Sequence, residues 1–206
     1  MHYLILILLW IAWCTLHSTM ISRFVTEALH RRLPRGFRYY RIFYNLVAAG
    51  TLLPVLLYAQ NIRGEVLISW SGPWIFLPVL CGLAALLFFV AGARYYDLFQ
   101  FLGLRQIKYD NTCAVLTDDC SLNTGGVLSM VRHPWYTGAI LIVWARPLDL
   151  AALITNVVLV AYIIVGTILE ERKLRLQFGE SYREYQRQVS VYFPIKWIRG
   201  IAKRKR

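Results

Sequence analysis

The sequence predicts an all-α integral membrane protein with about five transmembrane helices, the last two of which form a helical hairpin. Two observations carry this prediction. Hydrophobic residues make up 58% of the 206-residue chain and charged residues only 17%, whereas soluble domains average about 45–50% and about 25%. The chain also holds 23 Lys and Arg against 11 Asp and Glu, and such an excess in membrane proteins normally collects on the cytoplasmic side.

Five apolar stretches are the candidate membrane helices. A helix needs about 20 apolar residues to cross the hydrocarbon core, and four stretches have this length: Tyr3–Ser22, Ile42–Gln60, Trp74–Ala93 and Leu148–Leu169. Tyr3–Ser22 lacks a basic start and a small-residue cleavage site, so we expect an anchor and not a signal peptide. Pro134–Pro147 is apolar but reaches only about 21 Å as a helix. We therefore expect Pro134–Leu169 to form the hairpin.

The basic residues set the expected orientation. Residues 23–41, 94–132 and 170–206 hold 21 of the 23 Lys and Arg, and five crossings place these regions on one side. Positive charge stays cytoplasmic, so we expect a multi-pass protein of the inner (cytoplasmic) membrane, with its N-terminus outside and a cytoplasmic C-terminal helical segment. The basic tail Lys203–Arg206 is expected on anionic membrane lipids and not on nucleic acid.

A metal site is not expected. The four cysteines, Cys14, Cys81, Cys113 and Cys120, form no C-x-x-C pair, and no His pair has ligand spacing.

Residues 125–138 are dense in side chains that suit a binding site. Gly125 and Gly126 offer free backbone amides and close approach. Pro134 suits the first turn of a helix, which places Arg132 and His133 at the helix N-terminus, where an anion binds well. Tyr136 follows one turn later. The alternative is a basic cap at the membrane interface, in which His133 only caps the helix.

Residues 170–185 form the second dense stretch. Glu171, Leu174, Phe178, Tyr182, Tyr185 and Val189 have the spacing of one helical stripe, which Gly179 could bend. The alternative is a surface helix with Glu171 and Arg175 as an i,i+4 ion pair. Adjacent carboxylates at the end of an apolar helix are costly, however, and ionisable residues at the membrane edge indicate function.

The two stretches together resemble the isoprenylcysteine carboxyl methyltransferase and phospholipid methyltransferase superfamily. Its RHPxYxG element is similar to Arg132-His133-Pro134-Trp135-Tyr136-Thr137-Gly138. Its EExxLxxxFGxxYxxY…V…P element is similar to Glu170-Glu171, Leu174, Phe178-Gly179, Tyr182, Tyr185, Val189 and Pro194. His17-Ser18 and Tyr40-Arg41…Tyr44-Asn45 look like the bacterial NnrU-like or methanethiol S-methyltransferase-like branch.

The resemblance implies an integral-membrane methyltransferase that uses S-adenosylmethionine. Residues 1–93 would be an N-terminal three-helix membrane region. Residues 94–206 would be the methyltransferase core, made of a cytoplasmic loop, the membrane hairpin 134–169 and a C-terminal segment that closes over the cofactor. Cofactor contacts are expected from Gly125, Gly126, Arg132, His133, Tyr136, Glu170, Glu171 and Tyr182, and catalytic roles from Glu170, Glu171 and Arg175.

The acceptor stays open between an isoprenylcysteine-like carboxylate, a lipid amine and a small thiol. We expect it to partition into the membrane and to arrive sideways, past Gly138 and Ala139. Two other functions fit the same layout. A non-enzymatic membrane scaffold or regulator would bind no S-adenosylmethionine, and a sterol-reductase-like enzyme would bind NADPH.

Overall fold

The computed structural model describes residues 1–109 and 121–204, and within these ranges every regular element is a helix. Four described segments are long and apolar enough to cross a membrane. They are α1 (His2–Ile21), Phe37–Asn61 with η1 (Phe37–Tyr39) and α3 (Tyr40–Asn61), Gly72–Ala93 with η2 (Gly72–Ile75) and α4 (Phe76–Ala93), and α8 (Leu150–Phe178). The chain is therefore an all-α membrane protein, as the composition predicts.

The apolar stretch Pro134–Pro147 forms a helix over only part of its length. The helix α7 (Pro134–Trp144) has 11 residues, which corresponds to about 16 Å. It ends before the expected Pro147, and it is not among the four candidate spans of the described chain.

The chain divides into two compact units. The first contains residues 1–68, the described part of 98–113, and 148–159. The second contains residues 69–97 and the described parts of 114–147 and 160–206. Helix α8 begins in the first unit and ends in the second. The functional division at residue 93 that the resemblance implies stays a prediction.

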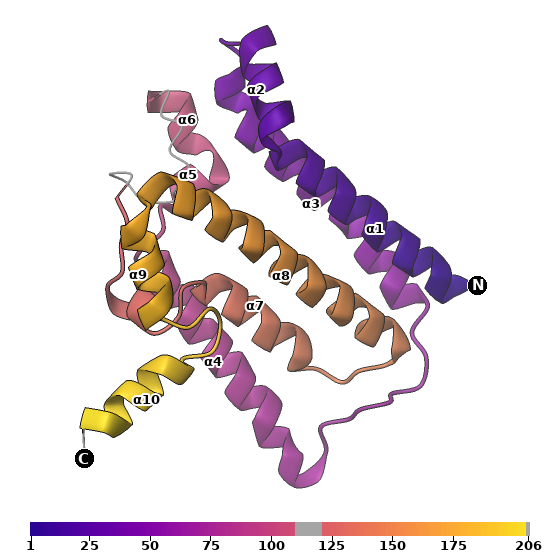
Figure 1. The fold of residues 1–206 in the computed structure, drawn as a ribbon. Coiled ribbons are helices and arrows are strands. Elements are labelled where there is room, and N and C mark those ends of the chain that lie inside the picture. The colour runs from indigo at the N-terminus through magenta and orange to yellow at the C-terminus, as the bar shows by residue number, and fades with distance from the viewer. Residues whose placement is uncertain (110–120, 205–206) are drawn as a thin grey trace. The chain divides into compact units, whose positions relative to one another are not determined.

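The first unit is built around α1 and α3, which lie side by side (Figure 1). Its buried core contains Leu6, Trp10, Val55 and Ala151. The buried Trp10 indole needs a polar partner, and its Nε1 donates to Thr155 Oγ1 at 3.1 Å. The smaller helices of this unit are α2 (Arg23–Arg32), α5 (Leu98–Leu102) and α6 (Leu104–Tyr109).

In the second unit, α4 and α7 lie side by side (Figure 1), and they pack closely because glycines lie at their contact. A Cβ on Gly92 would lie 2.6 Å from the Trp135 indole, and one on Gly138 would lie 3.1 Å from the Ala85 carbonyl oxygen. Small residues let membrane helices approach in this way. Trp135 Nε1 also donates to the Phe89 carbonyl at 3.1 Å. These contacts fix the first turns of α7 against α4.

The C-terminal part of the second unit wraps back toward the start of α7. Helix α8 continues past the expected Leu169 to Phe178, and Gly179 then adopts a φ of 58°, a conformation that glycine permits. The short helix α9 (Glu180–Gln188) follows, then residues 189–194, which we call the strap, and then α10 (Ile195–Arg204).

The predicted apolar stripe is confirmed as a packed cluster although the helix breaks at Gly179. Tyr182, Tyr185 and Val189 are buried together, and Leu174 and Phe178 pack against them.

Candidate functional site

The site is assembled where the strap pairs with the residues that precede α7. The η3 turn (Gly126–Ser129) leads into Val131, which forms an isolated parallel bridge with Ser190. Arg132 N donates to the Ser190 carbonyl at 2.9 Å, and His133 N donates to the Val191 carbonyl at 3.2 Å. His133 is the N-cap residue of α7 but makes no capping hydrogen bond with its side chain, and Pro134 occupies the first turn. The backbone positions of Arg132 and His133 are thus set by hydrogen bonds to the strap and by the start of α7 directly after them.

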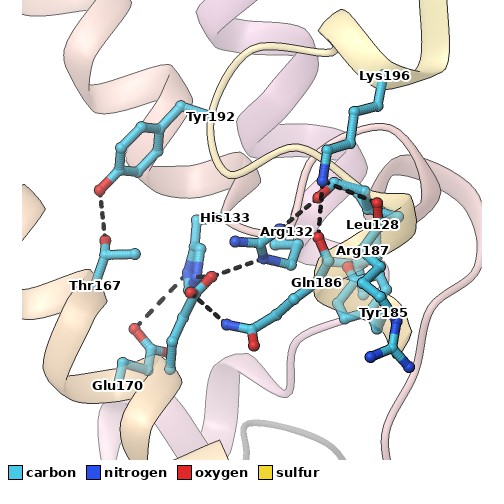
Figure 2. Close-up of polar contacts among 12 residues, drawn as sticks. Leu128, Arg132, His133, Thr167, Glu170, Tyr185, Gln186, Arg187, Tyr192 and Lys196 are labelled. Carbon is cyan, nitrogen blue, oxygen red and sulfur yellow. Dashed lines mark hydrogen bonds and ion pairs between the residues drawn. The ribbon is translucent and has the colours of Figure 1, made fainter. Parts of the chain in front are cut away.

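Arg132 is a buried cation whose partners lie on three elements, and Figure 2 draws its side chain with those of His133 and Gln186. Its Nε donates to Glu171 Oε1 at 2.7 Å on α8, and its Nη1 donates to the Gln186 carbonyl at 3.2 Å on α9. The same Nη1 also donates to the Val189 carbonyl of the strap. Because buried ions are tolerated only when paired and hydrogen-bonded, this side chain ties α8, α9 and the strap together.

His133 lies between aromatic rings. Its imidazole stacks on the Tyr136 ring with 5.3 Å between centroids and 7° between planes, and the Tyr192 ring lies 6.4 Å away. Nε2 lies 3.2 Å from Glu171 Oε1, and Nδ1 lies 3.8 Å from Glu170 Oε2. Each ring nitrogen of His133 therefore lies near one of the two carboxylates.

The two adjacent glutamates have different surroundings. The Glu171 side chain is 12% exposed and is contacted by three side chains. Gln186 Nε2 donates to its Oε2 at 2.7 Å, in addition to the contacts from Arg132 and His133. The Glu170 side chain is 43% exposed and accepts one hydrogen bond, from the Tyr136 hydroxyl to Oε2 at 2.8 Å. Among the described residues, Glu170 Oε1 has no partner and is free to bind a ligand.

Tyrosines beside this network stay protonated. Burial raises the pKa of the Tyr96 phenol, and the negative charge of Glu170 raises it further. Burial also raises the pKa of Tyr182 and of Tyr185. The Tyr185 hydroxyl donates to the Leu128 carbonyl at 2.6 Å. Phenols with raised pKa values act at neutral pH as hydrogen-bond donors and not as bases.

Five of the predicted site residues lie in one network: Arg132, His133, Tyr136, Glu170 and Glu171. The other four lie elsewhere in the unit. Gly126 has a φ of 51° and faces the Tyr95 ring, and Gly125 N donates to the Asn123 side chain. Tyr182 is buried in the apolar cluster, and Arg175 is exposed on α8. Their predicted roles stay predictions.

Sequence reasoning missed Gln186 and Tyr192. Gln186 lies four residues after Tyr182 on α9, so helical spacing places it on the inner face. The Tyr192 hydroxyl donates to Thr167 Oγ1 at 2.7 Å, and its carbonyl accepts from Thr137 Oγ1 at 2.8 Å. No spacing rule finds Tyr192, because the strap that carries it is irregular.

The sideways route of the acceptor stays a prediction, but Gly138 itself lies at a contact between two helices. Gly138 is buried on α7, and its Cα faces the Phe89 ring and the Ala85 carbonyl of α4. A bulky side chain there would separate α4 from α7, so it would test their packing and not the entry of an acceptor.

Comparisons with known proteins place the sequence. The family described as NnrU protein matches residues 5–202. The chain is 35% identical to methanethiol S-methyltransferase of Pseudomonas deceptionensis over 97 residues. This aligned region covers 47% of this chain and 37% of that protein. Over 97 residues the chain is 38% identical to methanethiol S-methyltransferase of Mycobacterium tuberculosis, covering 47% and 39%.

A third relative is methanethiol S-methyltransferase 1 of Bradyrhizobium diazoefficiens. It is 36% identical over 104 residues, which cover 50% of this chain and 35% of that protein. The similarity thus spans little more than a third of the length of these curated relatives. No solved structure matches the chain significantly.

Proposed function

Because this chain belongs to the NnrU protein family, in the bacterial branch of the isoprenylcysteine carboxyl methyltransferase-like superfamily, we propose that it is an integral-membrane, S-adenosylmethionine-dependent methyltransferase. The observation that carries the proposal is the unequal pair Glu170 and Glu171 in the C-terminal part of α8. Glu171 is contacted by three protein side chains, whereas the Glu170 side chain is 43% exposed and its Oε1 has no partner among the described residues. Glu171 therefore has a structural role in the site, and Glu170 is available to contact the cofactor or the acceptor.

The residues present fit the cofactor. A free carboxylate oxygen on Glu170 can accept hydrogen bonds from ribose hydroxyls or from an ammonium group. The Tyr136 ring, stacked on His133, offers a face to a cation. When bound, the cofactor supplies an activated methyl group on a sulfonium. Arg132 contributes by holding Glu171, since its Nε and Nη1 are already bound to protein oxygens.

We propose that the acceptor is a small, membrane-partitioning thiol. The matched relatives are named methanethiol S-methyltransferases, and a thiol must lose a proton before methylation because the thiolate is the nucleophile. The free Glu170 oxygen can take that proton. A carboxylate acceptor fits less well, because the cation Arg132 is paired with Glu171 and Glu170 would repel a second carboxylate. A lipid amine is the remaining alternative.

We also propose that the N-terminus lies outside and the C-terminus in the cytoplasm. Support comes from the 21 of 23 basic residues that five crossings collect on one side, with α7 contributing a short fifth arm. Cysteines introduced as Arg35→Cys and Arg204→Cys should then be labelled by a membrane-impermeant reagent alike, and Arg63→Cys oppositely. Labelling of the positions 35 and 63 from the same side would contradict this topology.

The activity is tested with the purified full-length protein in lipid vesicles. Labelled S-adenosylmethionine is supplied with methanethiol-like thiols, with lipid amines or with a prenylcysteine, and the label is followed into volatile, lipid and aqueous fractions. We expect label in the volatile thioether fraction. Calorimetry with S-adenosylhomocysteine measures cofactor binding separately from methyl transfer. Methyl transfer is also measured for Glu170→Gln, with Glu184→Gln on α9 as the matched control. Absence of S-adenosylhomocysteine binding, or binding of NADPH in its place, would contradict the proposal.

A further inference from the structure

The last helix of the chain has two chemically different sides. With 3.6 residues per turn, α10 (Ile195–Arg204) places Ile195, Trp197, Ile198, Ile201 and Ala202 along one side. Lys196, Arg199 and Lys203 lie along the opposite side. The sequence continues the positive charge with Lys205 and Arg206. The helix is therefore strongly amphipathic and basic.

The apolar side of α10 is exposed. The Trp197 side chain is 41% exposed and that of Ile198 is 55% exposed, and Ile195 and Ile201 are exposed as well. Exposed apolar side chains on α4 or α8 are accounted for by the acyl chains around a spanning helix. That explanation does not extend to α10, because 10 residues reach only about 15 Å and carry several charges.

We propose that α10 lies flat in the headgroup region of an anionic lipid leaflet. Its apolar side would enter the boundary of the acyl chains, and Arg199 and Lys203 would contact lipid phosphates. Basic amphipathic helices with Trp on the apolar side bind membranes in this way. Charge complementarity favours this occupant over a second protein, since a protein groove would cover the apolar side without requiring the row of cations beside it.

The connection of α10 to the site gives this surface a consequence. Lys196 Nζ donates to the Gln186 and Arg187 carbonyls at 2.9 Å each, which caps α9 (Figure 2). Lys196 N donates to Ser190 Oγ at 3.1 Å. The strap before α10 holds the backbone of Arg132 and His133. A leaflet that holds α10 therefore also holds the strap against the residues before α7.

The test uses spin labels on the full-length chain in vesicles and does not depend on the proposed activity. The four cysteines, Cys14, Cys81, Cys113 and Cys120, are replaced by serine, and single labels are introduced at Ile201→Cys, Arg199→Cys and, as a water-exposed reference, Arg183→Cys. In vesicles of phosphatidylcholine with phosphatidylglycerol, we expect the label at position 201 to collide with oxygen and those at 199 and 183 with a water-soluble nickel complex.

Charge reversal tests the anionic part of the proposal. In Arg199→Glu/Lys203→Glu, the label at position 201 should become accessible to nickel, with the equilibrium constant for membrane binding of α10 falling by at least about fivefold for each basic residue replaced. The matched control Arg31→Glu/Arg32→Glu makes the same change of charge on α2 and should leave the label at 201 unchanged. Vesicles of pure phosphatidylcholine should give the same result as the charge reversal.

Hydrogen exchange on the unmodified chain keeps the proposal testable if the cysteine-free protein does not fold. Backbone amides of residues 195–204 should exchange several-fold more slowly in anionic than in zwitterionic vesicles, while those of α1 should not change. Equal nickel accessibility at positions 201 and 199, equal exchange in both vesicle types, or spin–spin broadening between labels at 201 in two copies would each overturn the proposal.

Discussion

Two clusters of glutamate and arginine, one formed by Arg132 and Glu171 and one on α9, differ in what they connect. Glu171 on α8 and Arg132, which precedes α7, are mostly buried and join α8, α9 and the strap. On α9, Arg187 pairs with Glu180 and Glu184 at 2.7 Å and 2.5 Å, and all three side chains are half or more exposed. The hydrogen bonds from Arg187 hold the pKa of both carboxyls below its usual range. Similar residues thus form a site in one place and a solvated helix surface in the other.

The difference teaches that burial and the number of elements joined, rather than charge density, mark the site. The α9 pairs are contained within one helix and are screened by water and salt. The Arg132–Glu171 pair connects segments 39 residues apart in sequence, and each partner leaves an uncompensated buried charge when the other is removed.

The largest expected effect follows from removing Glu171. In Glu171→Ala, the guanidinium of Arg132 stays buried without its carboxylate, and loss of such a partner costs about 3–5 kcal/mol of stability. Thermal unfolding in detergent should show a clearly lowered midpoint, and Glu184→Ala provides the control. Equal midpoints for the two variants would remove the distinction between the clusters.

Arg132→Lys should have the next largest effect. An ammonium keeps the charge but cannot reproduce the planar fork that reaches Glu171 and the Gln186 carbonyl together. We expect a loss of about 1.5–3 kcal/mol, the range for hydrogen bonds to charged groups. The free energy of unfolding from denaturant titration measures it. A stability like that of the natural protein would mean that the charge alone suffices.

Tyr192→Phe should have a smaller effect. The substitution removes the hydroxyl that donates to Thr167 Oγ1 at 2.7 Å but keeps the ring beside His133. A single neutral hydrogen bond contributes about 1 kcal/mol. Backbone amides of the strap should therefore exchange faster in the variant than in the natural protein, while those of α4 should exchange at the same rate in both. Unchanged exchange in the strap would show that the backbone bonds to Arg132 and His133 hold it alone.

The α9 cluster should give the smallest effect. Arg187→Ala removes both pairs with Glu180 and Glu184, yet the exposed groups are hydrated in any case. The unfolding midpoint should stay within experimental error, and any residual difference should disappear in concentrated salt. A large shift that persists in salt would show that this cluster has a structural role after all.

Much of the architecture could be predicted because it depends on local sequence. Composition and the length of the apolar stretches indicate membrane helices, and the helical spacing of Tyr182, Tyr185 and Val189 predicts the cluster in which they pack. The position of Pro134 predicts the start of α7. Each of these features is determined by neighbouring residues.

The long-range part of the site could not be predicted. Nothing in the local sequence tells Glu170 from Glu171, because their roles depend on which donors the strap and α9 bring to them. The close contact of Gly138 with α4 depends likewise on helix pairing across the chain. For that reason the sequence did not reveal that Gly138 packs against α4.

The most direct test of the central claim compares Glu170→Gln with Glu184→Gln in the vesicle assay. The amide at position 170 can still accept the Tyr136 hydrogen bond, so both variants should unfold at the midpoint of the natural protein. Glu170→Gln should nevertheless lower methyl transfer to a thiol by about 10²–10⁴-fold, the range for loss of a general base, and Glu184→Gln should not. Full activity of folded Glu170→Gln would contradict the account.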